Sequence, residues 1–363
     1  MRLKYHFEPK KGWMNDPNGL IFFRGRYHAF FQHNPHAAVW GPMHWGHAVS
    51  DDLIRWEELP IALYPDQPYE DNGGCFSGSA IEKDGKLYLF YTSVSKALGQ
   101  TQSVAISEDG LNFTKYAGNP LIKAPPTDGS ADFRDPKVTL IDGVYYMVCG
   151  SGRDGAGKIL LFRSDDLFDW KYVGVLFEGA EYGRVLECPD FFKLGDRYVL
   201  MFSQMELKTH SSVFAVGDFD GSRFTPSAVG RPEAGPHFYA PQSFWDGKRR
   251  IVVGWMYSWD KPVPPDNTYT GAFSLPRELH ITDGDRVLLT PVSEAERLLT
   301  PGDPIVHVSG DLLTIDTSKT SSPVPLSYRS DAPGDIPGVS VLRDTKTLEV
   351  FINGRASFTV WLE

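Results

Sequence analysis

Short apolar segments separated by turns occupy most of the first 290 positions of the chain. Runs such as Leu20–Phe23, Leu87–Tyr91 and Tyr198–Phe202 are bounded by glycine, aspartate or asparagine, which is typical of β-strands. No segment before residue 290 shows the periodicity of a long amphipathic helix. The pattern therefore predicts an all-β protein.

Two sequence markers recur at a common period in this region. One is an aromatic residue that closes a Ser-(Asp/Glu)-Asp turn; it recurs at Trp56, Phe113 and Trp170, 57 residues apart each time, with a looser copy at Phe224. The other is a hairpin turn that ends in glycine, with successive spacings of 60, 58, 52 and 52 residues, at Gly25, Gly85, Gly143, Gly195 and Gly247. A period of about 55 residues with about four strands per repeat is typical of β-propeller blades. Five copies predict a five-bladed β-propeller, since chance similarity would not keep both markers in phase.

The pattern changes after residue 291. Ser293 and Glu296 form a Ser-x-x-Glu capping box that predicts a short helix. The remaining residues again resemble strands, with Asn353-Gly354 as a hairpin turn. We therefore divide the chain into a propeller (1–291), a short helical linker (292–300) and a small β-sandwich-like module (301–363).

Composition narrows the choice of partners and compartment. The formal net charge is −10, which lacks the basic footprint of a nucleic-acid binder and disfavours an anionic membrane surface. The three cysteines, Cys75, Cys149 and Cys188, are too widely spaced for a disulfide framework or a metal-binding pair. Without an apolar N-terminal segment or an apolar run of about 20 residues, the expected compartment is the cytoplasm.

The repeat places one polar side chain of each blade at an equivalent position. These side chains precede the turn glycine by nine residues in the first blade and by eight in the others: Asp16, Ser77, Asp135, Glu187 and Tyr239. If each precedes the innermost strand of its blade, the five ring one mouth of the central channel. Three of them are carboxyls, and we expect these three to meet in one pocket.

Convergent carboxyls without a histidine or cysteine cluster indicate acid–base and nucleophilic chemistry without a metal. Two carboxyls flanking a glycosidic bond are the usual equipment for glycoside hydrolysis. One must be ionised and the other protonated, a difference that burial and mutual repulsion produce. Aromatic residues suited to packing on sugar rings lie in or beside these segments: Trp13, Trp40, Trp45, Phe76, Tyr239 and Trp255.

Motifs around these residues resemble those of glycoside hydrolase family 32, the β-fructosidases. The three signature motifs are Trp13–Gly19 (WMNDPNG), Phe133–Pro136 (FRDP) and Glu187–Asp190 (ECPD). Shorter matches occur at Phe31–Pro35, Trp45–Ala48, Phe76–Ser79 and Phe238–Gln242. The resemblance extends from residue 5 to about residue 290 and implies the same five-bladed fold.

The resemblance also implies a role for each carboxyl. Asp16 is then the nucleophile that attacks a β-fructofuranosyl unit, and Glu187 is the general acid and base. Asp135 is then the group that stabilises the transition state through the ring hydroxyls. The expected outcome is retention, which requires the Asp16 and Glu187 carboxyls to lie about 5–5.5 Å apart. No cofactor or metal is implied.

The substrate-binding residues follow from the same resemblance. Arg134 is expected to orient the fructosyl group, and a further set is expected to complete its pocket: Asn15, Gln32, Trp40, Phe76, Ser77 and Tyr239. Trp45 and Trp255 are assigned to the pocket wall, with the hydrophobic core as the alternative. Lys208 and His210 are candidates for a leaving-group contact.

Three features depart from the family pattern. Leu186 stands where many members have tryptophan, which we expect to alter the pocket floor beside Glu187. His237 stands where many have aspartate, which we expect to remove a charge near the acid/base. The C-terminal module is shorter than usual.

The sequence favours a retaining β-fructofuranosidase that acts on sucrose or short fructooligosaccharides. A sucrose 6-phosphate hydrolase and a transfructosylase, with the same three acids, remain alternatives; Arg153, Arg184 and Lys208 are the candidate phosphate contacts. A non-catalytic fructan-binding propeller is the alternative from another class. Related propellers acting on arabinose or xylose lack the motifs around Asp16 and Glu187. Linkage, chain length and oligomeric state stay open.

Overall fold

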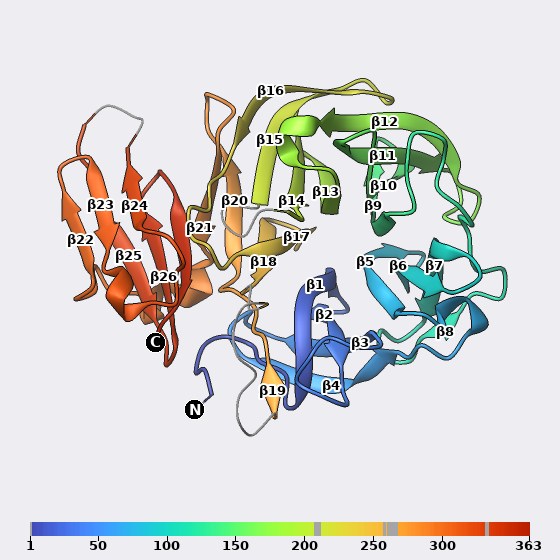
Figure 1. The fold of residues 1–363 in the computed structure, drawn as a ribbon, viewed down its shortest axis with the longest axis horizontal. Helices are drawn as coiled ribbons and strands as arrows, with labels where there is room; N and C mark the ends of the chain where they lie inside the picture. Colours follow the sequence, from blue (N-terminus) through green and yellow to red (C-terminus); the bar gives the residue numbers. More distant parts are fainter. Residues whose placement is uncertain (1, 207–211, 257–258, 260–267, 331–333) are drawn as a thin grey trace.

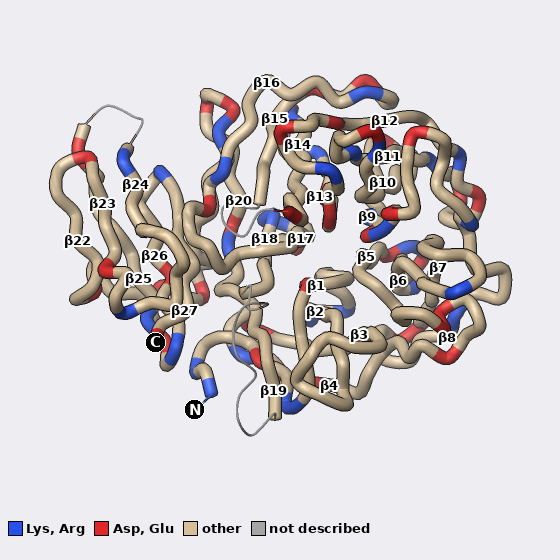
Figure 2. Tube along the Cα trace, in the orientation of Figure 1, with Lys and Arg blue, Asp and Glu red and all other residues tan. Residues whose placement is uncertain are grey.

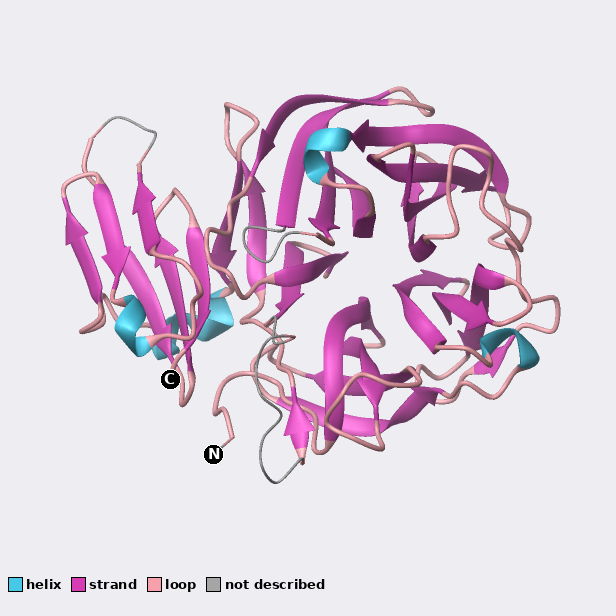
Figure 3. Cartoon of the chain, in the orientation of Figure 1, coloured by secondary structure: helices cyan, strands magenta, loops and turns pink. Residues whose placement is uncertain are grey.

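The computed structural model describes residues 2–206, 212–256, 259, 268–330 and 334–363. Five sheets surround a central opening, and two smaller sheets lie beside them (Figure 1). Strands dominate the fold, and the few helices are short 3-10 turns (Figure 3). No helix in the described ranges has the length and apolar character needed to cross a membrane. The predicted five-bladed propeller is confirmed.

Each blade is an antiparallel meander of four strands that follow one another along the chain. The one interruption is β19, which lies between two strands of the fifth blade in the sequence but pairs with the first blade. Blade one contains β1 (Gly12–Phe23), β2 (Arg26–Asn34), β3 (His44–Ser50) and β4 (Trp56–Leu63). After the 3-10 turn η1 (Pro68–Glu70), blade two contains β5 (Gly74–Lys83), β6 (Lys86–Ser95), β7 (Gly99–Ser107) and β8 (Thr114–Lys115). Blade three contains β9 (Phe133–Ile141), β10 (Val144–Arg153), β11 (Ala156–Ser164) and β12 (Lys171–Gly179). After η2 (Ala180–Tyr182), blade four contains β13 (Leu186–Leu194), β14 (Arg197–Gln204), β15 (Ser212–Phe219) and β16 (Phe224–Gly230). Blade five contains β17 (Tyr239–Trp245), β18 (Arg250–Trp255), β20 (Arg277–Ile281) and β21 (Val287–Pro291).

The first strands of the five blades form the wall of the central channel. β1, β5, β9, β13 and β17 contact one another in turn, and β17 returns to β1. The short strand β19 (Tyr269–Thr270) leaves blade five and pairs with β1 in parallel, through Tyr269 opposite Gly12 and Thr270 opposite Trp13. The last blade is thus tied to the first, and the ring closes.

Both sequence markers correspond to repeated turns. The hairpin glycines Gly25, Gly85 and Gly143 have φ of 82°, 75° and 86°, and the residues before them also have positive φ. Two consecutive residues of positive φ make a type I′ turn, whose twist matches the flanking strands. Each copy of the second marker contains an aspartate whose side chain accepts hydrogen bonds from the backbone N–H groups two and three residues later. These aspartates are Asp52, Asp109 and Asp166.

The C-terminal module consists of two three-stranded sheets. One contains β22 (Val306–Ser309), β23 (Leu312–Ile315) and β24 (Leu326–Arg329); the other contains β25 (Val339–Arg343), β26 (Thr347–Ile352) and β27 (Ser357–Trp361). Leucine, isoleucine and valine side chains from both sheets share one core. The 3-10 turn η4 (Thr317–Lys319) lies between β23 and β24. The linker contains a 3-10 helix, η3 (Ser293–Leu298), whose N-cap is Val292 without a side-chain cap, so the predicted capping box is wrong. Ser293 lies one residue inside the helix and its hydroxyl contacts Glu294 instead.

A buried charge network joins the module to the propeller. Arg277 of β20 is fully buried and forms ion pairs with Glu233 and with Glu349 of β26. His6 lies between Asp344 and Glu349, with its two ring nitrogens 2.9 and 2.7 Å from their carboxylate oxygens. The N-terminal segment, blade five and the module are therefore joined by five charged side chains.

Candidate active site

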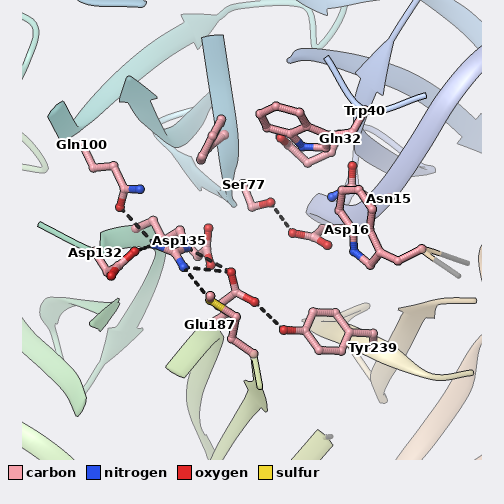
Figure 4. A pocket seen from close by; sticks show the side chains of 14 residues that line it. Asn15, Asp16, Gln32, Trp40, Ser77, Gln100, Asp132, Asp135, Glu187 and Tyr239 are labelled. Atoms are coloured by element: carbon pink, nitrogen blue, oxygen red, sulfur yellow. Dashed lines mark hydrogen bonds and ion pairs between the residues drawn. The ribbon is translucent and has the colours of Figure 1, made fainter. Parts of the chain in front are cut away.

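Five polar side chains from five blades line one cavity of about 410 Å³ at a mouth of the channel. Asp16, Ser77, Asp135, Glu187 and Tyr239 come from β1, β5, β9, β13 and β17, as the repeat predicts. In Figure 2, acidic positions lie at the inner ends of β1 and β13, beside the central opening. The complete lining is Asn15, Asp16, Gln32, Trp40, Phe76, Ser77, Gln100, Asp132, Arg134, Asp135, Glu187, Met205, Tyr239 and Trp259 (Figure 4).

Every channel strand loses its regular pairing at the site. The register shifts lie between Met14 and Pro17, Cys75 and Gly78, Arg134 and Lys137, Glu187 and Asp190, and Tyr239 and Gln242. A bulge re-aims side chains that would otherwise alternate between the two faces of a sheet. Five bulges at one level therefore direct five polar side chains toward the channel mouth.

Backbone strain coincides with three of these bulges. Asp135, Cys188 and Ala240 have φ of 63°, 49° and 49°, and each precedes a proline. Non-glycine residues rarely adopt this region, and its cost must be offset by surrounding contacts. The backbone N–H of Cys188 donates to Asp135 Oδ2 at 2.9 Å, and that of Ala240 donates to Ser203 Oγ at 3.0 Å.

Asp16 accepts a short hydrogen bond from the neighbouring blade. Ser77 Oγ donates to Asp16 Oδ2 at 2.6 Å, and the thiol of Cys188 lies 3.4 Å from the same oxygen. Burial raises the pKa of Asp16, with a further contribution from the charge of Glu187, and the Ser77 hydrogen bond opposes them. The nucleophile candidate is thus fixed in orientation while remaining weakly solvated.

Asp135 lies deepest of the three acids. Burial raises its pKa to about 7; Arg134 opposes the shift, and the charges of Glu187 and Asp16 add to it. The thiol of Cys188 lies 3.5 Å from Asp135 Oδ2. Because burial also raises the pKa of that thiol well above its usual value, Cys188 stays protonated and serves as a weak donor between two carboxyls.

Glu187 is held between a cation and a phenol. Arg134 Nε donates to Glu187 Oε1 at 3.0 Å, and the Tyr239 hydroxyl donates to Glu187 Oε2 (Figure 4). The side chain of Glu187 remains 20% exposed, at the open side of the cavity. Burial and the nearby carboxyl raise the pKa of Tyr239 well above its usual value, so its hydroxyl stays a donor.

The guanidinium of Arg134 is shared among several acceptors. Nη1 donates to Asp132 Oδ1 at 2.7 Å and to Gln100 Oε1 at 3.3 Å. Burial disfavours its charged form, but the charges of Glu187 and Asp135 outweigh burial and raise the pKa of Arg134. Arg134 therefore remains a cation at the centre of the acid cluster.

Four predicted sugar-binding residues also line the cavity: Asn15, Gln32, Trp40 and Phe76. Asn15 Oδ1 accepts from Trp13 Nε1 at 2.7 Å, and Gln32 Nε2 donates to the Cys75 carbonyl at 3.0 Å. The rings of Trp40 and Phe76 meet edge to face, 6.1 Å apart. Aromatic surface and fixed amides thus face the same space as the carboxyls.

Two residues assigned to the pocket wall lie behind it. Trp45 is fully buried and donates through Nε1 to the Phe76 carbonyl at 3.0 Å. Trp255 is also fully buried and packs edge to face against Trp13 and Tyr239. Both tryptophans therefore belong to the hydrophobic core, which was the alternative prediction for them. They affect the cavity only by supporting residues that line it.

The two departures from the family motifs do not reach the cavity either. Leu186 is fully buried in the core between blades three and four, so the expected change of the pocket floor is not seen. His237 faces the C-terminal module, where its Nδ1 accepts from the backbone N–H of Trp361 at 3.2 Å. The prediction that residue 237 lies near the acid/base is therefore wrong, because the module covers this part of blade five.

Four lining residues were not predicted from the sequence: Gln100, Asp132, Met205 and Trp259. Asp132 directly precedes the Phe133–Pro136 motif, which is a usable signal. Gln100 and Trp259 lie outside the repeated position and carry no such signal. Lys208 and His210 lie outside the described residues. Among the described residues no group of histidine, cysteine and acidic side chains has the arrangement of a metal site.

Comparison with known proteins gives a family match over most of the chain. The model for the N-terminal domain of glycosyl hydrolases family 32 matches residues 6–291. A sucrose-6-phosphate hydrolase of Escherichia coli is 42% identical over 318 residues, which cover 81% of this chain and 65% of that protein. A raffinose invertase of Escherichia coli is 42% identical over 328 residues, covering 84% and 67%. The chain thus spans about two thirds of the length of these relatives.

Solved structures agree over the whole fold. A GH32 β-fructofuranosidase of Bombyx mori superposes with a TM-score of 0.85 at 30% identity, covering 99% of this chain and 88% of that chain. A fructan 1-exohydrolase of Cichorium intybus superposes with a TM-score of 0.85 at 25% identity, covering 100% and 91%. Since the family model matches residues 6–291, the chain belongs to glycoside hydrolase family 32.

Proposed function

We propose that the protein is a retaining β-fructofuranosidase that releases terminal fructose from sucrose or short fructooligosaccharides. The observation that carries the proposal is the convergence of Asp16, Asp135 and Glu187 in one cavity, with sugar-binding side chains around them. Relatives of similar sequence are named sucrose-6-phosphate hydrolase, raffinose invertase and levanase.

In the first step, Asp16 attacks the anomeric carbon and the bond to the leaving oxygen breaks as Glu187 gives it a proton. The product is a fructosyl ester on Asp16. In the second step, Glu187 takes a proton from water, which attacks the same carbon and releases fructose with its original configuration. Asp135 is placed to accept hydrogen bonds from ring hydroxyls that strengthen in the transition state.

Protonation of Glu187 requires a change in its hydrogen bonds. In the free site both of its oxygens accept, one from Arg134 and one from Tyr239. A protonated carboxyl gains an O–H donor and accepts less strongly, so the hydrogen bond to its protonated oxygen weakens. Arg134 has other acceptors in Asp132 and Gln100, so it can leave Glu187 without losing all its partners.

The substitution D16N tests the proposal. An amide cannot form the ester, so we expect sucrose hydrolysis to fall by several orders of magnitude while the thermal unfolding midpoint stays near the wild-type value. D84N, at an exposed hairpin position, is the matched control and should keep full activity. Wild-type turnover in D16N would rule out Asp16 as the nucleophile. Product anomers followed by NMR should show retention.

Sucrose 6-phosphate is a second candidate substrate, because a relative of that name is 42% identical. Arg153 and Arg184 do not line the cavity; Arg184 forms an ion pair with Glu206 instead. Among the described lining residues the only cation is Arg134, which the acid cluster occupies. We therefore expect sucrose to be hydrolysed at least as fast as its 6-phosphate, as parallel rate measurements will show. NMR analysis of the products also distinguishes hydrolysis from fructosyl transfer. Turnover of either substrate excludes a purely binding role.

A further inference from the structure

A second cavity, of about 530 Å³, lies at the opposite end of the same channel. It is lined by later residues of the five channel strands, for example Leu20 of β1, Lys137 of β9 and Ser243 of β17. On β1 this is four residues beyond Asp16, and strands advance by about 3.3 Å per residue. The acid cavity and this one therefore open at different ends of the propeller.

Basic side chains outnumber acidic ones in the lining of this cavity. Lys137, Lys193 and Arg250 line it, against one carboxylate, Glu82. Lys193 forms an ion pair with Asp142 at 3.1 Å on the exposed rim. Lys137 also has an acidic partner, so Arg250 is the one cation in the lining of this recess without an ion pair among the described residues.

Lys137, in contrast to Lys193, is buried within the channel. Its ammonium pairs with Asp190 at 3.0 Å and donates to the Ser243 carbonyl at 2.6 Å. Burial lowers the pKa of Lys137; the charge of Asp190 opposes this shift and the charge of Arg250 adds to it, so the two cations repel each other across the recess. An anion between them would relieve that repulsion.

Arg250 is the cation that has no direct ion pair among the described residues, although the charge of Asp190 acts on it from a greater distance. Among the described residues its guanidinium has no ion pair or hydrogen bond, and it lies 4.1 Å over the ring of Phe192. Burial lowers the pKa of Arg250 to about 10, so it is charged at neutral pH although weakly solvated. A guanidinium presents a planar fork of donors that matches two oxygens of one anion.

Unsatisfied polar atoms surround this fork. Arg250 Nε, Ser243 Oγ and Asp190 Oδ1 are buried without a hydrogen-bond partner, and Ser243 is fully buried. Arg250 and Ser243 line the recess, and both are donors. Asp190 does not line it, and its other oxygen accepts from the Ser243 N–H at 2.6 Å and pairs with Lys137. Buried donors without acceptors are rare in native proteins, and these two belong to residues at the wall of the recess.

We propose that this recess binds a small oxyanion, either free or carried on a small organic molecule, with Arg250 as its principal contact and the Ser243 hydroxyl and Lys137 ammonium as further donors. Its volume exceeds that of a free anion. The ring of Trp245, which is half exposed, lies in its lining and offers an apolar face to the rest of a larger ligand.

Calorimetric titration of the full chain with inorganic phosphate at fixed ionic strength tests the proposal. We expect phosphate to saturate one site in the wild type. Its affinity should be at least about tenfold lower in R250Q and about threefold or more lower in S243A. K193Q is the matched control, because it removes a cation of the rim that already has a partner, and should bind within about twofold of the wild type. The unfolding midpoint and sucrose hydrolysis of R250Q, measured without phosphate, verify that its fold is intact.

A parallel titration with phenyl phosphate distinguishes the two sources of the anion. Tighter binding than phosphate indicates an organic ligand against Trp245, and equal binding indicates a free anion. The proposal is overturned if the wild type gives no saturable heat with either probe, which would mean that water alone fills the recess. It is also overturned if R250Q binds phosphate as tightly as the wild type, or if phosphate competes with sucrose, which would place the anion in the acid cavity.

Discussion

At the scale of residues, the environment distinguishes three carboxyls of nearly identical chemistry. Asp16 accepts from a hydroxyl, Asp135 lies buried against a backbone N–H, and Glu187 accepts from a guanidinium and a phenol. The most buried of the three, Asp135, is the carboxyl whose pKa burial raises to about 7, with a further contribution from the charges of Glu187 and Asp16. In the proposed mechanism, different surroundings rather than different side chains give the three carboxyls their separate tasks.

The raised pKa of Asp135 predicts a pH-dependent stability. Burial, with Glu187 and Asp16, raises this pKa from 3.8 to about 7, against the effect of Arg134. The folded state then binds more protons than the unfolded one between these values, so Asp135 lowers stability as the pH rises from about 4 to about 7. We expect D135N to unfold a few degrees higher than the wild type at pH 8 and at the same temperature at pH 4. An equal difference at both values would contradict the assignment.

At the scale of elements, the site depends on a device repeated in every blade. A bulge at the start of the channel strand turns a polar side chain toward the mouth, and a tight hairpin fixes where the strand ends. The rest of each blade packs in apolar clusters between sheets, such as that of blades three and four. The period of the sequence markers is therefore also the spacing at which the chain supplies polar side chains to the site.

Substitution of a hairpin glycine tests this element. Gly85 has a φ of 75° and its added Cβ would meet no atom within 4 Å, so G85A acts through backbone conformation alone. We expect the free energy of unfolding to fall by about 1–2 kcal/mol. Gly284 is the control, because its surroundings are equally open but its φ is not positive. G284A should change the free energy of unfolding by less than about 0.5 kcal/mol. Chemical denaturation measures both, and equal effects would contradict the turn geometry.

At the scale of the whole molecule, the propeller and the module are joined by buried charges. Truncating one partner of such a network leaves another buried charge uncompensated, which is strongly destabilising. The module contacts the propeller through His237 and the Arg277 network. It is thus a support for blade five, and none of its residues appears among those that line the acid cavity.

His6 makes this junction sensitive to alkaline pH. Burial opposes its charge, but Asp344 and Glu349 outweigh burial and raise its pKa from 6.5 to about 9. The stabilisation is complete below pH 6.5 and is lost as the pH rises through 9. We expect the unfolding midpoint of the wild type to fall between pH 6.5 and 9.5, and H6Q to be less stable at pH 6.5 and to lose most of that pH dependence. H280Q, at an exposed histidine, should behave as the wild type does. An unchanged pH dependence in H6Q would contradict this account.

The repeat made the architecture and the five mouth residues predictable, because equivalent positions in a ring are brought together by symmetry. It could not place Gln100 or Trp259, which reach the cavity from positions outside the period. The family resemblance misplaced His237, because the docking position of the module follows from packing and not from a motif. Trp45 and Trp255 show the same limit, since a motif does not reveal which side of a strand faces the ligand.

Trapping the covalent intermediate identifies the nucleophile. With a β-fructofuranosyl substrate whose leaving group needs no acid, E187Q should form the ester but lack the base that removes it. Mass spectrometry of proteolytic peptides should then find one fructosyl group, on Asp16, and the double variant D16N/E187Q should carry none. A fructosyl group on another residue, or release of fructose with inverted configuration, would contradict the account.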